Sequence, residues 1–352
     1  MSVFSPDGKF TRFIYQHARV VHAFKLFLAL LIAIVINGIW PLPHFIWSMV
    51  TIVIIMLGLP QVGSALEKSL QRAIGTCVGS LCGVLLIVGF QNYWALMGLL
   101  AMAVGLVCYI GKGRYSYAYL VTGFTMIIVV GDANHDTTEA VWRTANILLG
   151  CLIAVCVSLF ILPIKAKQDW RQQLSTVFAK QGSMLKKHLS AGINGAEDCR
   201  AELESTMKSV LAQKKLFFSL EWESRTLRHH KQRLEQLTQE QIRLVTLMEI
   251  LSQTRWRDDE YCSYAKINQL TVRLLPVLES LSQYVAGTSQ SLAPLPEQMG
   301  MTLHQELLAS LDEHEQHQFA LTGYTWLLYQ YACAVESLHA DIAALGTIAR
   351  SR

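Results

Sequence analysis

The sequence predicts an all-α protein in which a six-helix transmembrane domain precedes a cytoplasmic helical bundle. Of its 352 residues, 52% are hydrophobic and only 16% are charged, whereas ordinary soluble domains carry about 25% charged residues. The charge is also unevenly distributed: residues 1–163 contain nine Lys or Arg and five Asp or Glu, so they hold the whole net charge of +4, and the remaining 189 residues are balanced. These features exclude a nucleic-acid-binding protein with a basic domain, a secreted disulfide scaffold and a single soluble fold.

Six apolar segments form the predicted membrane domain. Residues 26–66 contain no charge, and this stretch is too long for one helix, because about 20 apolar residues cross a bilayer. Pro41 and Pro43 divide it into two spans. We therefore expect spans at residues 22–40, 45–59, 73–90, 93–111, 115–131 and 145–162. The expected domains are an amino-terminal segment at 1–21, the membrane domain at 22–163 and the bundle at 164–352.

Basic residues alternate between the predicted loops. The amino-terminal segment, the second and fourth loops and the segment after the sixth span are basic, whereas the intervening loops contain one basic residue, Arg143. Because short cytoplasmic loops are enriched in Lys and Arg, we expect both termini in the cytoplasm. An aromatic belt is then expected at the outer interface from Trp40, Trp47, Tyr93, Trp94 and Trp142. The polar, basic start and the span-length apolar run after it do not resemble a cleavable signal peptide.

The membrane domain contains a candidate internal repeat. A displacement of 71 residues aligns Arg72 with Arg143, Gly79 with Gly150, and Val50-Thr51 with Val121-Thr122. Since each unit has three spans, an odd number, the two units must have opposite orientations. This is the inverted 3+3 repeat found in many transporters.

Small residues recur every four positions in the third and sixth spans. They are Gly75, Gly79 and Gly83 in one span, and Gly150, Ala154 and Ser158 in the other. The plainer interpretation is that they let helices approach closely, which is a main source of packing energy in lipid. The alternative interpretation is that the two stripes line or hinge a substrate path.

Arg72 and Arg143 are the candidate anion-binding residues. Each opens a glycine-containing span in the sequence, where free helix N–H groups would also attract an anion, and a guanidinium matches a carboxylate in a two-point geometry. Thr51 and Thr122 could add hydroxyls near mid-membrane. The alternatives are a lipid-phosphate anchor for Arg72 and, for Arg143, an ion pair with an acid of its own loop (Asp132, Asp136 or Glu139).

Three groups of residues resemble the fusaric acid resistance and aromatic acid exporter family. They are residues 47–51 (WSMVT), residues 72–76 (RAIGT) with Gly79, and residues 142–144 (WRT) with Gly150, closing at Leu162-Pro163. The resemblance implies efflux of organic anions, particularly aromatic carboxylates, across a bacterial inner membrane. It also implies self-association, with a dimer favoured, because larger family members look like two such units in one chain. Plant malate channels share a similar plan.

After residue 164 the pattern becomes that of amphipathic helices. Leu234, Leu237, Leu244, Leu247 and Leu251 form an apolar stripe in a helical region at 202–251, with a break expected near 221–225. Trp170, Leu174, Val177 and Phe178 form another apolar face. We expect a turn at 191–195, a helix at 264–285, a loop at 287–300 and a final helix at 312–348. Burial of these stripes predicts an antiparallel bundle.

The sequence indicates neither an enzyme nor a metal protein. His314-Glu315-Gln316-His317 lacks the spacing of a zinc protease motif, and the pairs Cys77/Cys82 and Cys151/Cys156 lie in apolar spans. We expect no cofactor and no nucleic-acid partner; the expected partners are the lipid bilayer, a small organic anion and a second copy of the chain. The alternative to a transporter is a membrane scaffold whose bundle recruits a protein.

Overall fold

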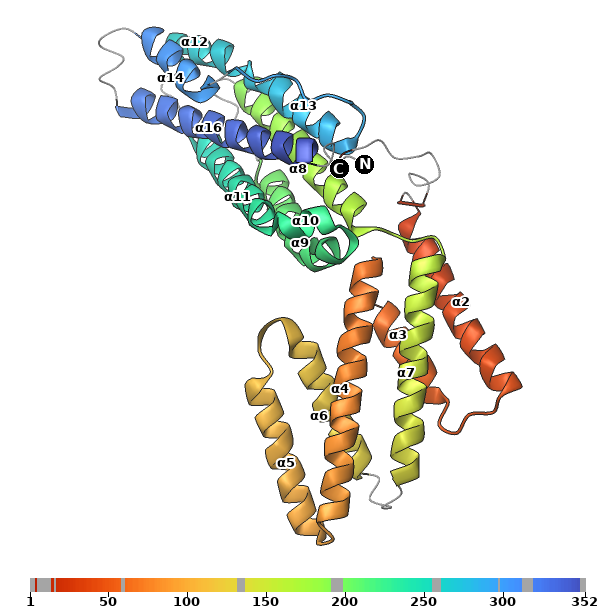
Figure 1. Cartoon of the computed structure of the whole chain (residues 1–352). Coiled ribbons are helices and arrows are strands. Elements are labelled where there is room, and N and C mark those ends of the chain that lie inside the picture. The colour runs from red at the N-terminus through yellow and green to blue at the C-terminus, as the bar shows by residue number, and fades with distance from the viewer. Residues whose placement is uncertain are drawn as a thin grey trace. The chain divides into compact units, whose positions relative to one another are not determined.

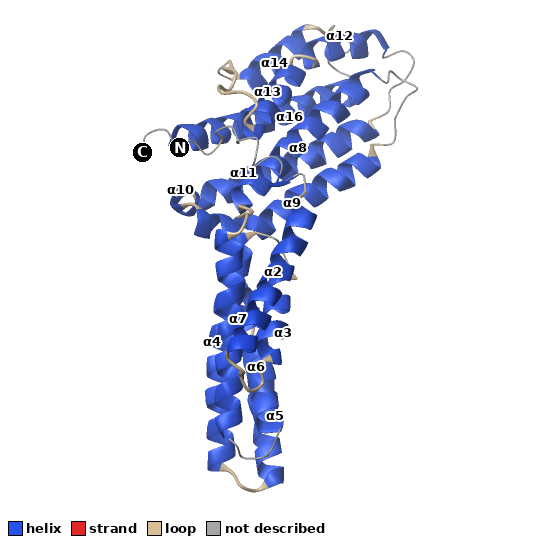
Figure 2. Ribbon diagram, turned by 90° about the vertical axis from the view of Figure 1, so that its right-hand side faces the viewer, coloured by secondary structure: helices blue, strands red, loops and turns tan. Residues whose placement is uncertain are grey.

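The computed structural model divides the chain into two compact units. One comprises Lys9–Ala166, and the other comprises Met1–Gly8 with Lys167–Arg352. The structure describes residues 4, 14–15, 17–57, 61–131, 137–190, 199–254, 261–296, 298–311 and 319–348. Within these ranges the chain forms helices and loops and no strand, so the predicted all-α class is confirmed for them (Figure 2).

The apolar unit contains a helix at each of the six expected spans (Figure 1). Four of these helices are long and apolar enough to cross a membrane: Ala18–Ile39, Val62–Gly89, Tyr93–Ile110 and Thr138–Phe160. The other two helices are shorter: Ile46–Met56 has 11 residues and Ser116–Gly131 has 16 residues. At 1.5 Å per residue they extend about 16 Å and about 24 Å, against roughly 30 Å of hydrocarbon. The helices are α2 (Ala18–Ile39), α3 (Ile46–Met56), α4 (Val62–Gly89), α5 (Tyr93–Ile110), α6 (Ser116–Gly131) and α7 (Thr137–Phe160).

Two of these helices begin well before the predicted spans. Helix α4 begins at Val62 rather than at residue 73, and α7 begins at Thr137 rather than at residue 145. Arg72 and Arg143 therefore lie inside helices and not at helix amino termini, so the expected contribution of free N–H groups is wrong. The expected starts were set by charge, but Glu, Gln, Lys and Arg are good helix formers, and a helix continues through them.

Large apolar side chains cover the outside of this unit. Phe24, Phe27 and Leu31 on α2 are between 42% and 61% exposed, and Met102 and Leu106 on α5 are 67% and 57% exposed. A soluble protein rarely exposes so continuous an apolar surface, whereas lipid tails solvate it. The unit thus has the surface of a membrane domain.

The unit consists of two helix triplets, α2–α4 and α5–α7, and helices of each triplet pack against helices of the other, which we call exchanged packing. Helix α4 of the first triplet packs against α6 of the second, and α7 of the second packs against α3 of the first; α4 and α7 also contact each other. Likewise α2 contacts α3 and α7, and α5 contacts α6 and α4. Replacing each helix by its counterpart three places along leaves these contacts unchanged, whereas the smaller α3–α4 contact has no equal between α6 and α7 in the described residues.

Glycines make the two exchanged contacts close. A Cβ built on Gly79 would lie 2.6 Å from the Thr122 carbonyl oxygen, and one built on Gly150 would lie 2.6 Å from the Ser48 carbonyl oxygen. Either methyl group would overlap backbone, which cannot move aside easily, so helix α6 lies directly on α4 and α3 directly on α7. Ala154 and Ser158, on the same helix as Gly150, are 0% and 4% exposed.

The second unit is built from amphipathic helices. The predicted apolar faces are buried: Trp170, Leu174, Val177 and Phe178 are each 0% exposed, and the five leucines at 234–251 are at most 8% exposed. Phe4 packs on this unit, with its ring 6.1 Å from that of Trp170 and 5.3 Å from that of Tyr284. The helices are α8 (Ala166–Ser190), α9 (Arg200–Glu223), α10 (Arg225–His229), α11 (Lys231–Gln253), α12 (Tyr261–Thr271), α13 (Leu274–Ala286), α14 (Met299–Ala309) and α16 (Phe319–Ile348).

The helix boundaries of this unit agree with prediction at one place and differ from it at two. The break near 221–225 is confirmed at Ser224, which has an extended backbone. The single helix expected at 264–285 is two helices, α12 and α13, interrupted at residues 272–273. A helix, α14, occupies 299–309, where only a loop up to residue 300 was expected, and the expected start of the final helix at 312 and the turn at 191–195 lie outside the described residues.

Candidate functional site

Arg72 lies on α4 of the apolar unit, where this helix faces both α3 and α6. Its side chain is buried, and its Nε donates to the Thr51 hydroxyl at 3.2 Å. Its Nη1 donates to the Tyr117 hydroxyl at 3.3 Å. Both partners are neutral, and within the described part of the chain no Asp or Glu carboxylate forms an ion pair with this guanidinium. Among the described residues, the guanidinium of Arg72 is therefore hydrogen-bonded without a neutralising carboxylate.

Small residues beside Arg72 bring its partners within reach. A Cβ on Gly75, one turn along α4, would lie 2.5 Å from the Ala118 carbonyl oxygen, so α6 approaches α4 closely just beside Tyr117. On the other side of Arg72, Gly150 of α7 allows α3 to approach closely. A Cβ built on Gly150 would lie only 2.9 Å from the Cβ of Thr51. The small-residue stripes therefore position the hydroxyls that hold Arg72.

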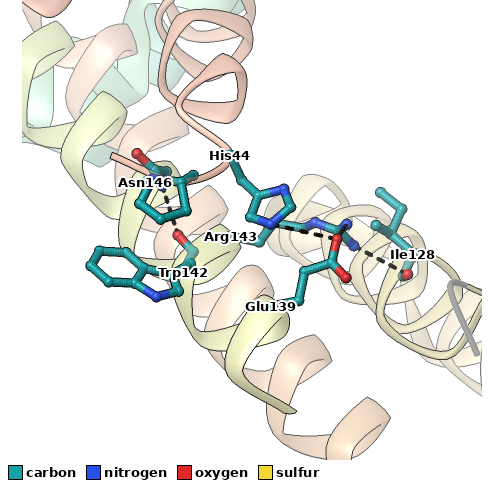
Figure 3. A network of polar contacts seen from close by, with 7 residues as sticks. His44, Ile128, Glu139, Trp142, Arg143 and Asn146 are labelled. Carbon is teal, nitrogen blue, oxygen red and sulfur yellow. Dashed lines mark hydrogen bonds and ion pairs between the residues drawn. The ribbon is translucent and has the colours of Figure 1, made fainter. Parts of the chain in front are cut away.

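Arg143 has charged and backbone partners instead. Its Nη2 lies 3.1 Å from Glu139 Oε1, one turn earlier on α7, and its Nη1 donates to the Ile128 carbonyl at 3.2 Å (Figure 3). The guanidinium also lies 5.2 Å from the centre of the Trp47 ring, which adds a cation–π contact. Of the interpretations drawn from the sequence, the ion pair with an acid near the same loop is the one that the structure shows. Asp132 and Asp136 lie outside the described residues.

A polar network fastens the connection between α2 and α3 to α7 beside Arg143. Asn146 donates from Nδ2 to the Trp142 carbonyl at 2.9 Å (Figure 3). It also donates to the Pro43 carbonyl at 2.8 Å, and its Oδ1 accepts from the Ser48 hydroxyl at 3.1 Å. His44 Nε2 lies 3.7 Å from Glu139 Oε1. This network fixes the Glu139–Arg143 pair in place.

The sequence-predicted residues are only partly brought together. Thr51 contacts Arg72, but the Thr122 hydroxyl donates to the Ala118 carbonyl within its own helix at 2.9 Å. Tyr117 and Asn146 were missed, because single polar residues in apolar spans carry no spacing signal until the facing helix is known. Among the described residues, no three His, Cys, Asp or Glu side chains gather into a group that could hold a metal ion.

Arg143 and the partner of Arg72 lie at different levels when both are projected on the axis of α7. Thr51, which contacts Arg72, packs on Gly150, and Gly150 lies seven residues beyond Arg143 on the same helix. At 1.5 Å per residue this corresponds to about 10 Å. Two guanidiniums therefore lie at successive levels of the unit: among the described residues that of Arg72 has no carboxylate partner, whereas that of Arg143 is paired with Glu139.

A family model and several curated proteins match this chain. The model of the fusaric acid resistance protein family matches residues 19–351. The inner membrane protein YeeA of Escherichia coli strain K12 is 28% identical over 199 residues, which cover 56% of this chain and 55% of that protein. The Arabidopsis thaliana aluminum-activated malate transporter 2 is 28% identical over 203 residues, covering 51% of this chain and 39% of that protein.

A third relative is the p-hydroxybenzoic acid efflux pump subunit AaeB of Pectobacterium carotovorum strain PC1. It is 23% identical over 246 residues, which cover 66% of this chain and 37% of that protein. In each of these three cases the match spans less than two thirds of the relative's own length.

Proposed function

Because the chain belongs to the fusaric acid resistance protein family, we propose that it is a multi-pass inner-membrane transporter that moves organic carboxylate anions, aromatic ones included, out of the cell. The observation that carries this proposal is Arg72, a buried guanidinium held by two neutral hydroxyls in an apolar helical unit. A buried cation without a counter-charge is costly. A mobile carboxylate supplies that counter-charge when it binds.

The relatives support the chemical class of the substrate. One is named for p-hydroxybenzoic acid and another for malate, and both of these molecules are carboxylates. Arg72 has five N–H donors in a planar fork, of which two hold Thr51 and Tyr117. The rest suffice for two-point recognition of a carboxylate. In the same proposal, Arg143 is a second binding site for the carboxylate, and its ion pair with Glu139 weakens its attraction for that anion.

The exchanged packing of the two triplets supports the inverted 3+3 repeat. In inverted-repeat transporters the substrate binds near the midplane, where the two repeats meet. Arg72 belongs to the first triplet and Tyr117 to the second, so the site joins the two. The short helices α3 and α6 occupy equivalent places in the two halves, which is the sequence sign expected of a binding site in this architecture.

Transport in proteoliposomes tests the role of Arg72. We expect Arg72→Gln to reduce p-hydroxybenzoate flux at least tenfold, since a charge-assisted hydrogen bond contributes about 1.5–3 kcal/mol. Arg72→Lys should retain an intermediate flux because it keeps the charge but not the fork. Lys112→Gln, at an exposed cation of the same unit, is the matched control and should transport normally. Full flux of both p-hydroxybenzoate and malate in Arg72→Gln would contradict the assignment.

We also propose that the chain acts as a homodimer and catalyses no chemical reaction. Self-association follows from the family resemblance, in which larger members look like two such units in one chain. Light scattering of the detergent-purified protein should give the mass of two chains, and a stable single chain that transports normally would contradict the dimer.

A scaffold function is the second candidate, and the separate compact unit of Lys167–Arg352 favours it. This alternative predicts that a transport-dead variant such as Arg72→Gln still retains a specific protein partner. Affinity purification of that full-length variant against the wild type tests this, and recovery of no shared partner counts against the scaffold.

A further inference from the structure

Lys25 is a third buried cation of the apolar unit, in addition to Arg72 and Arg143. It lies on α2, its side chain is 1% exposed, and its Nζ donates to the Ser158 carbonyl of α7 at 3.5 Å. That bond is at the long limit for a hydrogen bond. Over the described ranges, Lys25 has no ion pair with an acid and no further hydrogen bond.

The position of Lys25 is not that of a membrane-surface anchor. Lysines near helix ends usually extend their ammonium group to the interface, where it stays in water. Lys25 is instead enclosed by protein and turned toward α7. Ala29 and Ala33, one and two turns further along α2, belong to an apolar cluster with Ala154 and Val157 of α7. The ammonium therefore sits directly beside apolar packing.

The contact that the 71-residue displacement aligns with this one packs without a charge. The 71-residue displacement places Lys25 on Leu96 and Ser158 on Ile87. Leu96 and Ile87 are 3% and 7% exposed and belong to one apolar cluster. The α5–α4 contact is thus closed by hydrocarbon where the equivalent α2–α7 contact holds a lysine. A residue that the fold does not require, and that is unfavourable in a buried apolar place, points to a role in binding.

Projected on the axis of α7, the contact of Lys25 lies at a third level, beyond those of Arg143 and Arg72. Its acceptor, Ser158, lies eight residues beyond Gly150, the level at which Thr51 holds Arg72. This corresponds to about 12 Å along the helix, against about 10 Å between the levels of Arg143 and Arg72. A series of separated sites allows an anion to enter and still leave, because no one site holds it too tightly.

We propose that Lys25 is a further binding site for the transported carboxylate, at the α2–α7 contact on the side of Arg72 opposite to Arg143. The ammonium exchanges its long bond to the Ser158 carbonyl for a shorter, charge-assisted bond to the carboxylate. This inference rests on the proposed function, since it adds a third binding site, after Arg72 and Arg143, to the same path. It makes the path asymmetric: one end offers a cation, and the equivalent place at the other end is closed by Leu96 and Ile87.

Charge removal at Lys25 tests the inference in proteoliposomes loaded with p-hydroxybenzoate. Lys25→Gln can still donate to the Ser158 carbonyl but carries no charge, and we expect its KM for p-hydroxybenzoate to rise at least tenfold. Lys25→Arg should restore the KM to within about threefold of the wild type, and Lys112→Gln should leave it unchanged. The melting temperature of Lys25→Gln should equal or exceed that of the wild type, because a buried charge is removed. Lys25→Met provides a second neutral variant if Lys25→Gln does not fold.

The outcomes separate this inference from the proposed function. Wild-type transport with an unchanged KM in both neutral variants would overturn the role of Lys25 and leave the role of Arg72 intact. A loss of transport that Lys25→Arg fails to rescue, accompanied by a lower melting temperature, would assign Lys25 to the fold and would also overturn it. Absence of transport by the wild type for both p-hydroxybenzoate and malate would remove the proposed function and this inference together.

Discussion

At the scale of single residues, the two arginines that the 71-residue displacement aligns have different electrostatic surroundings. Arg72 is held by the hydroxyls of Thr51 and Tyr117, whereas Arg143 is paired with Glu139. A guanidinium with neutral partners keeps its attraction for an external anion, and a paired one loses most of it. An arginine at each of the two aligned positions therefore does not make the same interactions at both.

The Glu139–Arg143 pair makes a stability prediction. Glu139→Gln leaves a mostly buried Arg143 without its counter-charge, and we expect a loss of about 1–3 kcal/mol, reduced from the fully buried case because Glu139 is partly exposed. The double variant Glu139→Gln/Arg143→Gln should recover part of that loss. Thermal unfolding in detergent measures it. Glu204→Gln, in an exposed pair with Lys208, serves as the control and should change little.

His188 predicts a pH dependence in the second unit. Burial lowers the pKa of His188 from 6.5 to about 4, and its Nε2 lies 2.8 Å from the Tyr324 hydroxyl. The folded state therefore keeps this imidazole neutral, while the unfolded state takes up a proton below pH 6.5. The stability that His188 contributes is fully present above pH 6.5 and is lost as the pH falls toward 4.

We expect this group to account for a loss of about 2 kcal/mol between pH 7.5 and pH 5.0, since each unit corresponds to 1.36 kcal/mol. His188→Gln should remove that part of the pH dependence, and His229→Gln, at an exposed histidine, should retain it. Unfolding curves at the two pH values decide the matter. An equal pH dependence in wild type and His188→Gln would contradict the assignment.

At the scale of helices, close approach decides which elements can form the site. Helix α4 contacts α6 through Gly75, Gly79 and Gly83, and α7 contacts α3 through Gly150. Without these contacts Tyr117 and Thr51 would not reach Arg72. The packing and the path interpretations of the small residues are therefore not exclusive, because the packing itself positions the polar groups.

Alanine substitutions test this closeness directly. Gly79→Ala and Gly150→Ala should each destabilise the protein by about 1–3 kcal/mol, because the added methyl meets backbone at 2.6 Å. Gly98→Ala is the matched control: nothing lies within 4 Å of its Cβ position, and alanine favours a helix over glycine by up to about 1 kcal/mol. Equal melting temperatures for Gly79→Ala and Gly98→Ala would show that the helices do not approach this closely.

At the scale of the whole molecule, the chain combines an apolar unit with a unit of amphipathic helices. The distribution of Lys and Arg predicts that both termini lie in the cytoplasm. A fluorescent protein fused after Arg352 should therefore be bright, and alkaline phosphatase fused at the same place should be inactive. Phosphatase activity at that position would reverse the topology and with it the direction assigned to the path.

The sequence by itself determined the helical class, the positions of the six apolar helices and the apolar faces of the second unit. These follow from composition and periodicity, which act over a few residues. It placed the starts of α4 and α7 too late, because charge ends an apolar run but does not end a helix.

Only the tertiary structure decided which cation is neutralised. In the sequence, Arg72, Arg143 and Lys25 are alike, because each is an isolated charge near an apolar run. Arg143 pairs with Glu139 of its own helix. Arg72 and Lys25 instead bind Tyr117 and Ser158, which lie on other helices. The energy of a buried charge depends on groups within a few ångströms in space, whatever their distance along the chain. For that reason the arrangement of helices, and not the sequence pattern, singles out Arg72 and Lys25.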